Sequence, residues 1–151
     1  MILVVTGTIG FSDLVKKVDE LLEQGKIKDN IIIQIGNSDY IPKNCAYFKF
    51  KPSLEPYYKK ADLVISHGGA ATTFEVICKG IKLISINNPH RIDKHQEDLL
   101  TVLSKNKNLL WCRNLAELDK YLAKAEKFKF KKYIKPTCEI YEEIVRFLDK
   151  I

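Results

Sequence analysis

The stretch ADLVISHGGAATTFEVICKG, residues 61–80, decides how this chain folds. An apolar run leads into His67-Gly68-Gly69, and a helix-forming segment follows until Gly80, a typical helix terminator. Glycines between a strand and a helix let the backbone approach a ligand closely. The helix start adds N–H groups and the positive end of its dipole, which suit a phosphate or diphosphate. The turn is therefore a candidate anion site.

The helix after this turn carries three polar residues with two interpretations each. Thr72 and Thr73 add hydroxyl donors to an anion site, or they satisfy the helix start of an ordinary tight turn. Glu75 accepts hydrogen bonds from two ribose hydroxyls, or it forms an i,i+4 ion pair with Lys79. The spacing alone leaves the threonines undecided and favours the ion pair for Glu75.

Strands alternate with helices through the whole chain. Apolar runs predict strands at 2–6, 30–36, 45–50, 61–66, 82–86 and 108–112. Helical spacing or short helical turns follow at 11–25, 52–61, 70–80, 93–105, 114–125 and 137–151. Because the strands are apolar on both faces, we expect one domain, residues 1–151, with a doubly wound parallel sheet of the Rossmann-like α/β class.

Ligands of such folds bind beyond the carboxyl ends of the strands, so the loops there are the candidate sites. The GTIG loop after the first strand lacks the GxGxxG spacing of dinucleotide binders and is a weak signal by itself. His95 and Gln96 stand at the open end of an apolar helix face, where they can bind sugar hydroxyls. Alternatively, Gln96 reaches back to Asp93 in a capping box, and His90 is an ordinary loop residue.

The composition, 46% hydrophobic and 29% charged with a net charge of +6, is that of a globular domain. The positive charge gathers in KAEKFKFKKYIK, residues 124–135, which reads as a solvated, weakly ordered connection or as a binding patch for anionic lipid or nucleic acid. We expect no nucleic acid, because no recognised binding motif accompanies the charge. The cysteines form no CxxC pair, and no metal-ligand cluster or nucleophile–base pair is evident. Because the first residues have no basic stretch and no small-residue cleavage site, we expect no signal peptide there.

Taken together, ADLVISHGGAATTFEVICKGIKLISINN and KHQEDLL resemble the nucleotide-sugar-binding half of family 28 glycosyltransferases of the GT-B fold. The likeness is in particular to the small subunits of two-part UDP-N-acetylglucosamine transferases. The opening MILVVTGTIGFSDLV resembles the first strand, loop and helix of such subunits, so the likeness covers residues 1 to about 105. As departures, family members often carry alanine at the place of Gly69 and serine-like residues at those of Ala71 or Thr73.

The resemblance implies that the glycine turn holds the donor diphosphate, Glu75 the ribose and His95-Gln96 the sugar. Backbone near Phe50 and Lys51 would contact uracil, and the first loop would line the cleft. The expected substrate-binding residues are Thr6, Gly7, Thr8, Phe50, Lys51, His67, Gly68, Gly69, Thr72, Glu75, His95 and Gln96.

The resemblance also implies a partner, because a GT-B enzyme needs a second Rossmann-like domain to bind the acceptor. We expect a membrane-anchored subunit that binds a lipid-linked glycan acceptor, supplies the catalytic base and docks partly on the C-terminal helix at about 137–151. The chain itself would be cytoplasmic, held at the membrane through this partner, and would need no metal or cofactor. A non-catalytic nucleotide-binding or scaffolding subunit is the alternative.

Overall fold

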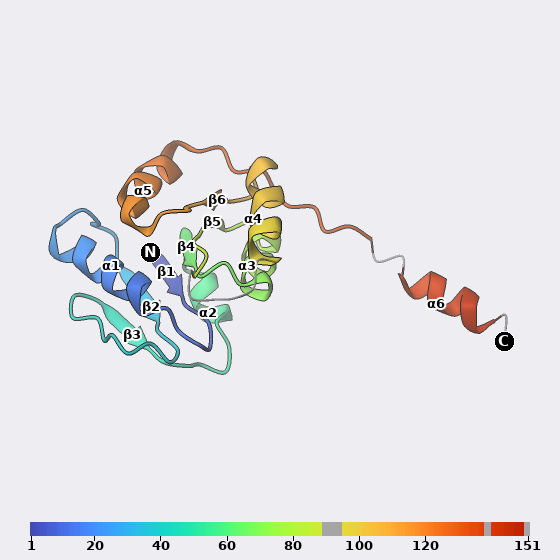
Figure 1. The fold of residues 1–151 in the computed structure, drawn as a ribbon, viewed down its shortest axis with the longest axis horizontal. Coiled ribbons are helices and arrows are strands. Elements are labelled where there is room, and N and C mark those ends of the chain that lie inside the picture. The colour runs from blue at the N-terminus through green and yellow to red at the C-terminus, as the bar shows by residue number, and fades with distance from the viewer. Residues whose placement is uncertain (89–94, 138–139, 150–151) are drawn as a thin grey trace.

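The predicted doubly wound sheet is confirmed. A computed structural model describes residues 1–88, 95–137 and 140–149 (Figure 1). Its strands form one parallel sheet in the order β3-β2-β1-β4-β5-β6, and the strand order reverses between β1 and β4 as in a Rossmann sheet. The strands are β1 (Ile2–Val5), β2 (Ile31–Gln34), β3 (Ala46–Phe48), β4 (Leu63–Ser66), β5 (Lys82–Ser85) and β6 (Leu110–Trp111).

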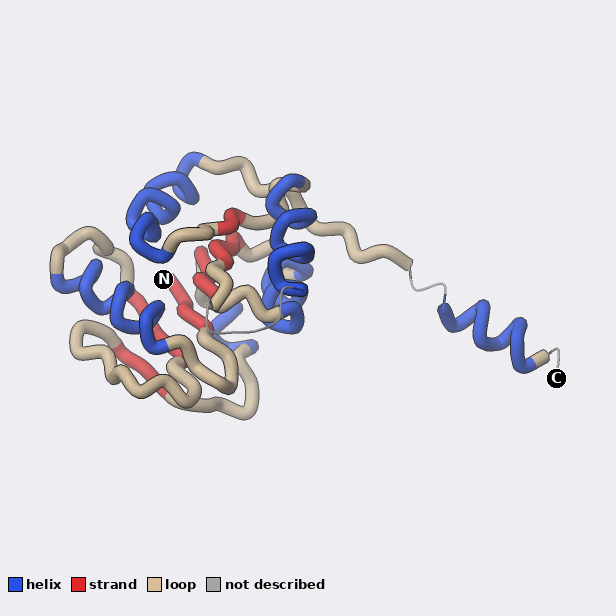
Figure 2. Tube along the Cα trace, viewed as in Figure 1, coloured by secondary structure: helices blue, strands red, loops and turns tan. Residues whose placement is uncertain are grey.

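Helices cover both faces of the sheet, as Figure 2 shows. On one face lie α1 (Ser12–Glu23), the short 3-10 helix η1 (Leu115–Glu117) and α5 (Leu118–Lys127). The other face carries α2 (Glu55–Tyr58), α3 (Ala70–Cys78) and α4 (His95–Lys105). A last helix, α6 (Ile140–Leu148), projects from this body.

The two cores follow from the alternation of side chains along each strand. In β1, Ile2 and Val4 pack into the core under α1 and α5, whereas Leu3 and Val5 pack into the core under α3 and α4. Because both faces are covered, the strand must be apolar at every position, which is why the sequence shows runs rather than alternation.

The loop between β2 and β3 is held to α1 by a buried carboxylate. Asp19, only 2% exposed, accepts hydrogen bonds from the backbone N–H groups of Lys43 (3.0 Å) and Asn44 (2.8 Å) and from the Tyr40 hydroxyl (2.8 Å). Burial raises the pKa of Asp19, but these donors outweigh it and hold the pKa below the usual 3.8. The carboxylate therefore stabilises the folded chain in its charged form.

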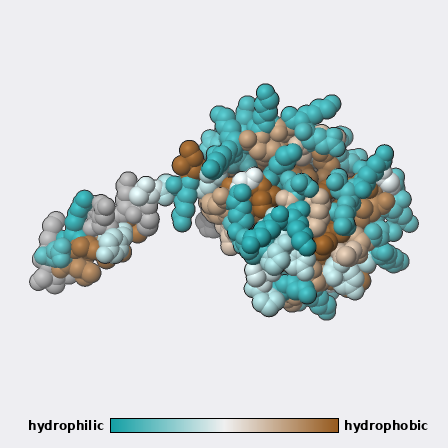
Figure 3. Space-filling view, turned by 180° about the vertical axis from the view of Figure 1, so that it is seen from behind, coloured by the Kyte–Doolittle hydropathy of each residue, from teal (hydrophilic) through white to brown (hydrophobic). Residues whose placement is uncertain are grey.

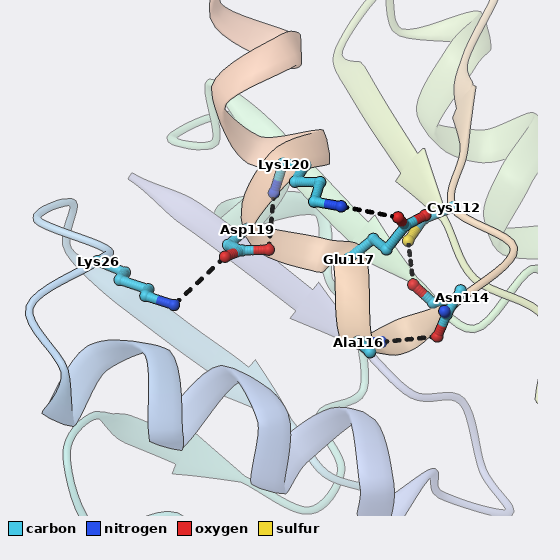
Figure 4. Close-up of polar contacts among 7 residues, drawn as sticks. All are labelled: Lys26, Cys112, Asn114, Ala116, Glu117, Asp119 and Lys120. Carbon is cyan, nitrogen blue, oxygen red and sulfur yellow. Dashed lines mark hydrogen bonds and ion pairs between the residues drawn. The ribbon is translucent and has the colours of Figure 1, made fainter.

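Polar contacts fasten the start of α5 (Figure 4). Asn114 caps η1, as its side chain accepts from the Ala116 N–H group at 3.0 Å. Lys26, after α1, lies 3.3 Å from the Asp119 carboxylate and links the two helices of this face. The second ion pair, Lys120 with Glu117, is exposed and contributes little.

Residues 124–135, called the basic strap below, differ from the weakly ordered connection that composition suggested. The first four belong to α5, and the rest is anchored by aromatic side chains. Phe128 and Phe130 pack edge to face, 4.8 Å between centroids, against the α1 side of the core. Tyr133 packs on Phe74 at the other core, so the strap crosses from one face of the sheet to the other.

The C-terminal helix α6 exposes its apolar side chains. Ile140, Tyr141, Ile144, Phe147 and Leu148 are each at least half exposed, and hydrophobic atoms gather on this helix in Figure 3. Among the described residues, no helix has the length and apolar composition needed to cross a bilayer.

Candidate functional site

A pocket of about 400 Å³ opens where β1 and β4 end, at the point where the strand order reverses. Loops after these strands form its walls: Thr6, Gly7, Thr8, Ile9 and Gly10 on one side, and His67, Gly69, Ala70, Ala71 and Thr72 on the other, with Asn88 after β5. Doubly wound sheets bind ligands in this crevice because the loops diverge there.

One wall of the pocket is the N-terminus of α3. The first helical bond runs from the Thr73 N–H group to the Gly69 carbonyl at 2.9 Å. The preceding N–H groups, those of Ala70, Ala71 and Thr72, therefore have no intrahelical acceptor and lie at the pocket lining. Together with the helix dipole they make this wall suitable for an anion.

The His67 ring lies between the two loops and explains two of the glycines. Its Nδ1 atom is 3.2 Å from the Val5 carbonyl, which holds the ring toward the end of β1. A Cβ atom added to Gly7 would come within 2.7 Å of the ring, and one added to Gly69 within 2.5 Å of Nε2. Gly7 also adopts φ +73°, which side-chain-bearing residues rarely adopt. The glycines thus make room for a histidine that borders the pocket.

Gln34, which the sequence reasoning passed over, fixes the first loop. Its Oε1 accepts from the Gly7 N–H group, and its Nε2 donates to the carbonyls of Gly7 and Lys49, each at 3.1 Å. One nearly buried amide therefore joins the pocket loop to the segment before Phe50. In the sequence, the one indication of this role is that Gln34 is a polar residue inside the apolar run IIIQIG.

Glu75 does not form the ion pair with Lys79 that its spacing favoured. Lys79 Nζ instead lies 2.6 Å from the Glu55 carboxylate on α2. Glu75, exposed on α3, accepts a hydrogen bond from the buried Tyr58 hydroxyl at 3.3 Å. Burial, with Glu75 beside it, raises the pKa of Tyr58, so Tyr58 stays a donor. The Glu75 carboxylate is thus available at the surface of α3.

The candidate residues whose side chains are described divide into three groups. Thr6, Gly7, Thr8, His67, Gly69 and Thr72 line the pocket together. Gly68 adopts φ +77°, and a Cβ added to it would lie against Leu100. Thr73 is buried, and its hydroxyl oxygen has no hydrogen-bond partner among the described residues. Phe50, Lys51, Glu75 and Gln96 lie outside the pocket lining, Phe50 being 50% exposed.

Part of the loop after β5 lies outside the described residues. The capping role suggested for Asp93 and the loop position of His90 fall there, and the His95 side chain is likewise not described. Gln96 is half-buried at the start of α4, and Leu100 and Leu103 on the same helix face are buried, as its spacing predicted. Ile9 and Gly10 of the GTIG loop and Asn88 after β5 also line the pocket, although they were not among the individually predicted substrate-binding residues.

A larger cavity, about 730 Å³, lies at the other end of the sheet, beside the amino ends of β1, β4 and β5. Its walls combine apolar side chains with the Lys26–Asp119 ion pair, and no turn from strand to helix opens into it. The smaller pocket, with its helix start and glycine loops, is therefore the candidate site.

The structure is a doubly wound α/β domain with a pocket at the switch point of its sheet, and sequence comparison identifies the protein family. Residues 1–150 match the model of the glycosyltransferase family 28 C-terminal domain, so the chain belongs to that family. The predicted family resemblance is confirmed.

Two curated relatives carry transferase names. The human UDP-N-acetylglucosamine transferase subunit ALG13 is 32% identical over 122 residues, which are 74% of this chain and 11% of that protein. The UDP-N-acetylglucosamine--N-acetylmuramyl-(pentapeptide) pyrophosphoryl-undecaprenol N-acetylglucosamine transferase of Cupriavidus metallidurans is 33% identical over 116 residues, 69% of this chain and 32% of that protein. The matched part thus spans between a tenth and a third of the relatives' length.

Solved structures agree on the fold. MurG of Acinetobacter baumannii superposes with a TM-score of 0.72 at 22% identity, covering 99% of this chain and 49% of MurG. A solution structure of ALG13 gives 0.63 at 20% identity, covering 95% of this chain and 93% of that one. At these identities the likeness establishes the architecture, which is that of one half of the GT-B fold.

Proposed function

We propose that this chain is the donor-binding subunit of an inverting glycosyltransferase and that it binds a UDP-sugar, in particular UDP-N-acetylglucosamine. The observation that carries the proposal is the pocket at the β1–β4 switch point, where the start of α3 and the His67 ring face the loop after β1. The names of the relatives, which specify UDP-N-acetylglucosamine as donor, support the choice of sugar.

In this proposal, the diphosphate lies against the N–H groups of Ala70, Ala71 and Thr72, next to His67. The Glu75 carboxylate, oriented by Tyr58, accepts hydrogen bonds from the ribose hydroxyls. Uracil lies along the backbone near Phe50 and Lys51, which Gln34 connects to the first loop through Lys49.

His95 and Gln96, at the start of α4, would meet the hydroxyls of the donor sugar. A hydroxyl of the acceptor attacks the anomeric carbon in line, and the bond to the diphosphate breaks with both electrons leaving on UDP. The added negative charge on the departing diphosphate is stabilised by the helix start and its hydroxyl donors. No cofactor besides the donor is invoked, and the base that takes the acceptor proton belongs to the partner.

The partner is proposed to be a membrane-anchored subunit that binds a lipid-linked glycan, and the chain would work at the cytoplasmic side of a membrane. Two observations support a partner: the relative ALG13 is named a subunit, and this chain corresponds to about half of MurG. The exposed apolar side chains of α6 offer the docking surface.

Reconstitution tests the proposal. The chain, co-expressed with a candidate partner that has one membrane helix, is expected to transfer labelled N-acetylglucosamine from UDP to a lipid acceptor, whereas each subunit alone is not. Ile144→Asp with Phe147→Asp should abolish transfer and co-purification while leaving UDP binding intact, because charges would enter the apolar face of α6. Arg146→Gln, on the opposite side of this helix, is the control.

A stable complex that binds UDP but never transfers sugar would contradict the enzymatic proposal. That result would favour the alternative, a non-catalytic nucleotide-binding or scaffolding subunit.

A further inference from the structure

The basic strap carries almost all of the net charge of the protein. Residues 124–135 contain six lysines and one acidic residue, Glu126, whereas the net charge of the whole chain is +6. Removing the strap would thus leave a nearly neutral molecule. Charge concentrated in this way gives one part of the surface a positive potential and leaves the rest balanced.

The fold arranges these lysines on the outside. Phe128, Phe130 and Tyr133 are half-buried and turned to the two cores, and the residues between them, Lys129 and Lys131-Lys132, are exposed. Alternation in an extended segment places the charged side chains away from the body. The strap therefore presents a row of ammonium groups that its aromatic side chains hold in place.

Two hydrogen bonds at Lys131 fix the strap against the body and bring a further lysine next to it. The Lys131 N–H group donates to the Lys107 carbonyl at 2.8 Å, and the Asn108 side chain donates to the Lys131 carbonyl at 3.1 Å. This brings the exposed Lys107 next to the row. Among the ion pairs of the described residues, none neutralises Lys127, Lys129 or Lys132.

An exposed apolar side chain stands beside the charges. Ile134 is 83% exposed and directly precedes Lys135, the last lysine of the strap. Lysines combined with an apolar residue suit the interface of an anionic bilayer, where the charges meet lipid headgroups and the apolar group enters the boundary region.

The chemistry of the strap separates lipid from other anionic partners. Proteins bind single-stranded nucleic acid by stacking its bases on aromatic side chains. The three aromatic rings of the strap instead pack against other rings at the two cores, which disfavours this use. Protein interfaces are enriched in arginine and depleted in lysine, and the strap contains lysine alone as its cation. Hydrated ammonium groups on flexible stems instead match a diffuse negative surface.

We propose that the basic strap is a direct binding surface for anionic phospholipid, so that the chain contacts the membrane with its own residues in addition to any partner subunit. The inference rests on the charge of the strap and on its anchoring beside the edge strand β6. It requires no nucleotide in the pocket.

Vesicle co-sedimentation of the isolated full-length chain tests this surface. We expect binding to phosphatidylcholine vesicles that contain phosphatidylserine, little binding to phosphatidylcholine alone, and loss of binding as salt rises. The triple variant Lys129→Gln, Lys131→Gln, Lys132→Gln should partition on the order of 100-fold more weakly, the effect of three charges near the surface. The charge-matched variant Lys16→Gln, Lys59→Gln, Lys60→Gln should bind as the wild type.

Both triple variants change exposed side chains, and circular dichroism and UDP binding should be unchanged in each. Equal loss in the two variants would overturn the proposal, because net charge rather than the strap would then be responsible. So would binding of the wild type to single-stranded RNA with no binding to phosphatidylserine vesicles. Failure of UDP binding in the wild type would count against the proposed function and leave this inference standing.

Discussion

Replacing Glu75 by alanine is expected to weaken UDP binding about 100-fold while leaving the fold intact. The carboxylate is exposed on α3 and, among the described residues, accepts one side-chain hydrogen bond, from Tyr58, so we expect its removal to have little effect on stability. In the proposed complex it accepts two ribose hydroxyls, and each hydrogen bond to a charged group contributes about 1.5–3 kcal/mol. Isothermal titration calorimetry with UDP measures the change.

Three further variants sharpen this test. Glu75→Gln should keep part of the affinity, because one amide oxygen still accepts. Tyr58→Phe removes the donor that orients the carboxylate and should weaken binding within about tenfold. Glu23→Ala, at the exposed end of α1, should bind like the wild type. Unchanged affinity in Glu75→Ala would remove the ribose role from this residue.

Asp19→Ala is expected to destabilise the chain by about 3 kcal/mol, seen as a fall in melting temperature of about 10 °C. The substitution leaves the Lys43 and Asn44 N–H groups and the Tyr40 hydroxyl without their acceptor. Thermal unfolding followed by circular dichroism gives the shift. Asp29→Ala, an exposed carboxylate before β2, should change stability by less than about 0.5 kcal/mol.

The contribution of Asp19 depends on pH in a defined direction. Since its pKa is lower in the folded chain than the usual 3.8, the carboxylate stabilises the fold above that value, and the stabilisation disappears as pH falls through the folded pKa. The difference in melting temperature between wild type and Asp19→Ala should therefore be full at neutral pH and shrink below about pH 4. A difference that stays constant on acidification would contradict the role of the charged form.

The order of the elements could be read from the sequence because each strand is buried on both faces. A run such as ILVV fits only a strand that is covered on both faces. Gly25 and Gly80 adopt the positive φ angles that end the helices before them. The pocket loops could be named for the same reason: a parallel sheet brings all carboxyl ends of its strands to one edge.

Long-range contacts could not be read in this way. The spacing favoured a Glu75–Lys79 pair, but α2 brings Glu55 to Lys79, and nothing local to α3 indicates that. Gln34 bonds Gly7, 27 positions away, and the His67 ring lies against the Val5 carbonyl, 62 positions away. The strap looked unstructured by composition because its aromatic residues find partners only in the folded cores.

The central claim is that the start of α3 binds a pyrophosphate, and an amide NMR titration tests it most directly. Labelled chain titrated with UDP should show saturating shifts at Gly7, Gly69, Ala70, Ala71 and Thr72, and uridine without phosphates should bind at least about tenfold more weakly. Shifts of equal size and affinity with uridine and UDP, or no change at these amides at millimolar UDP, would contradict the account.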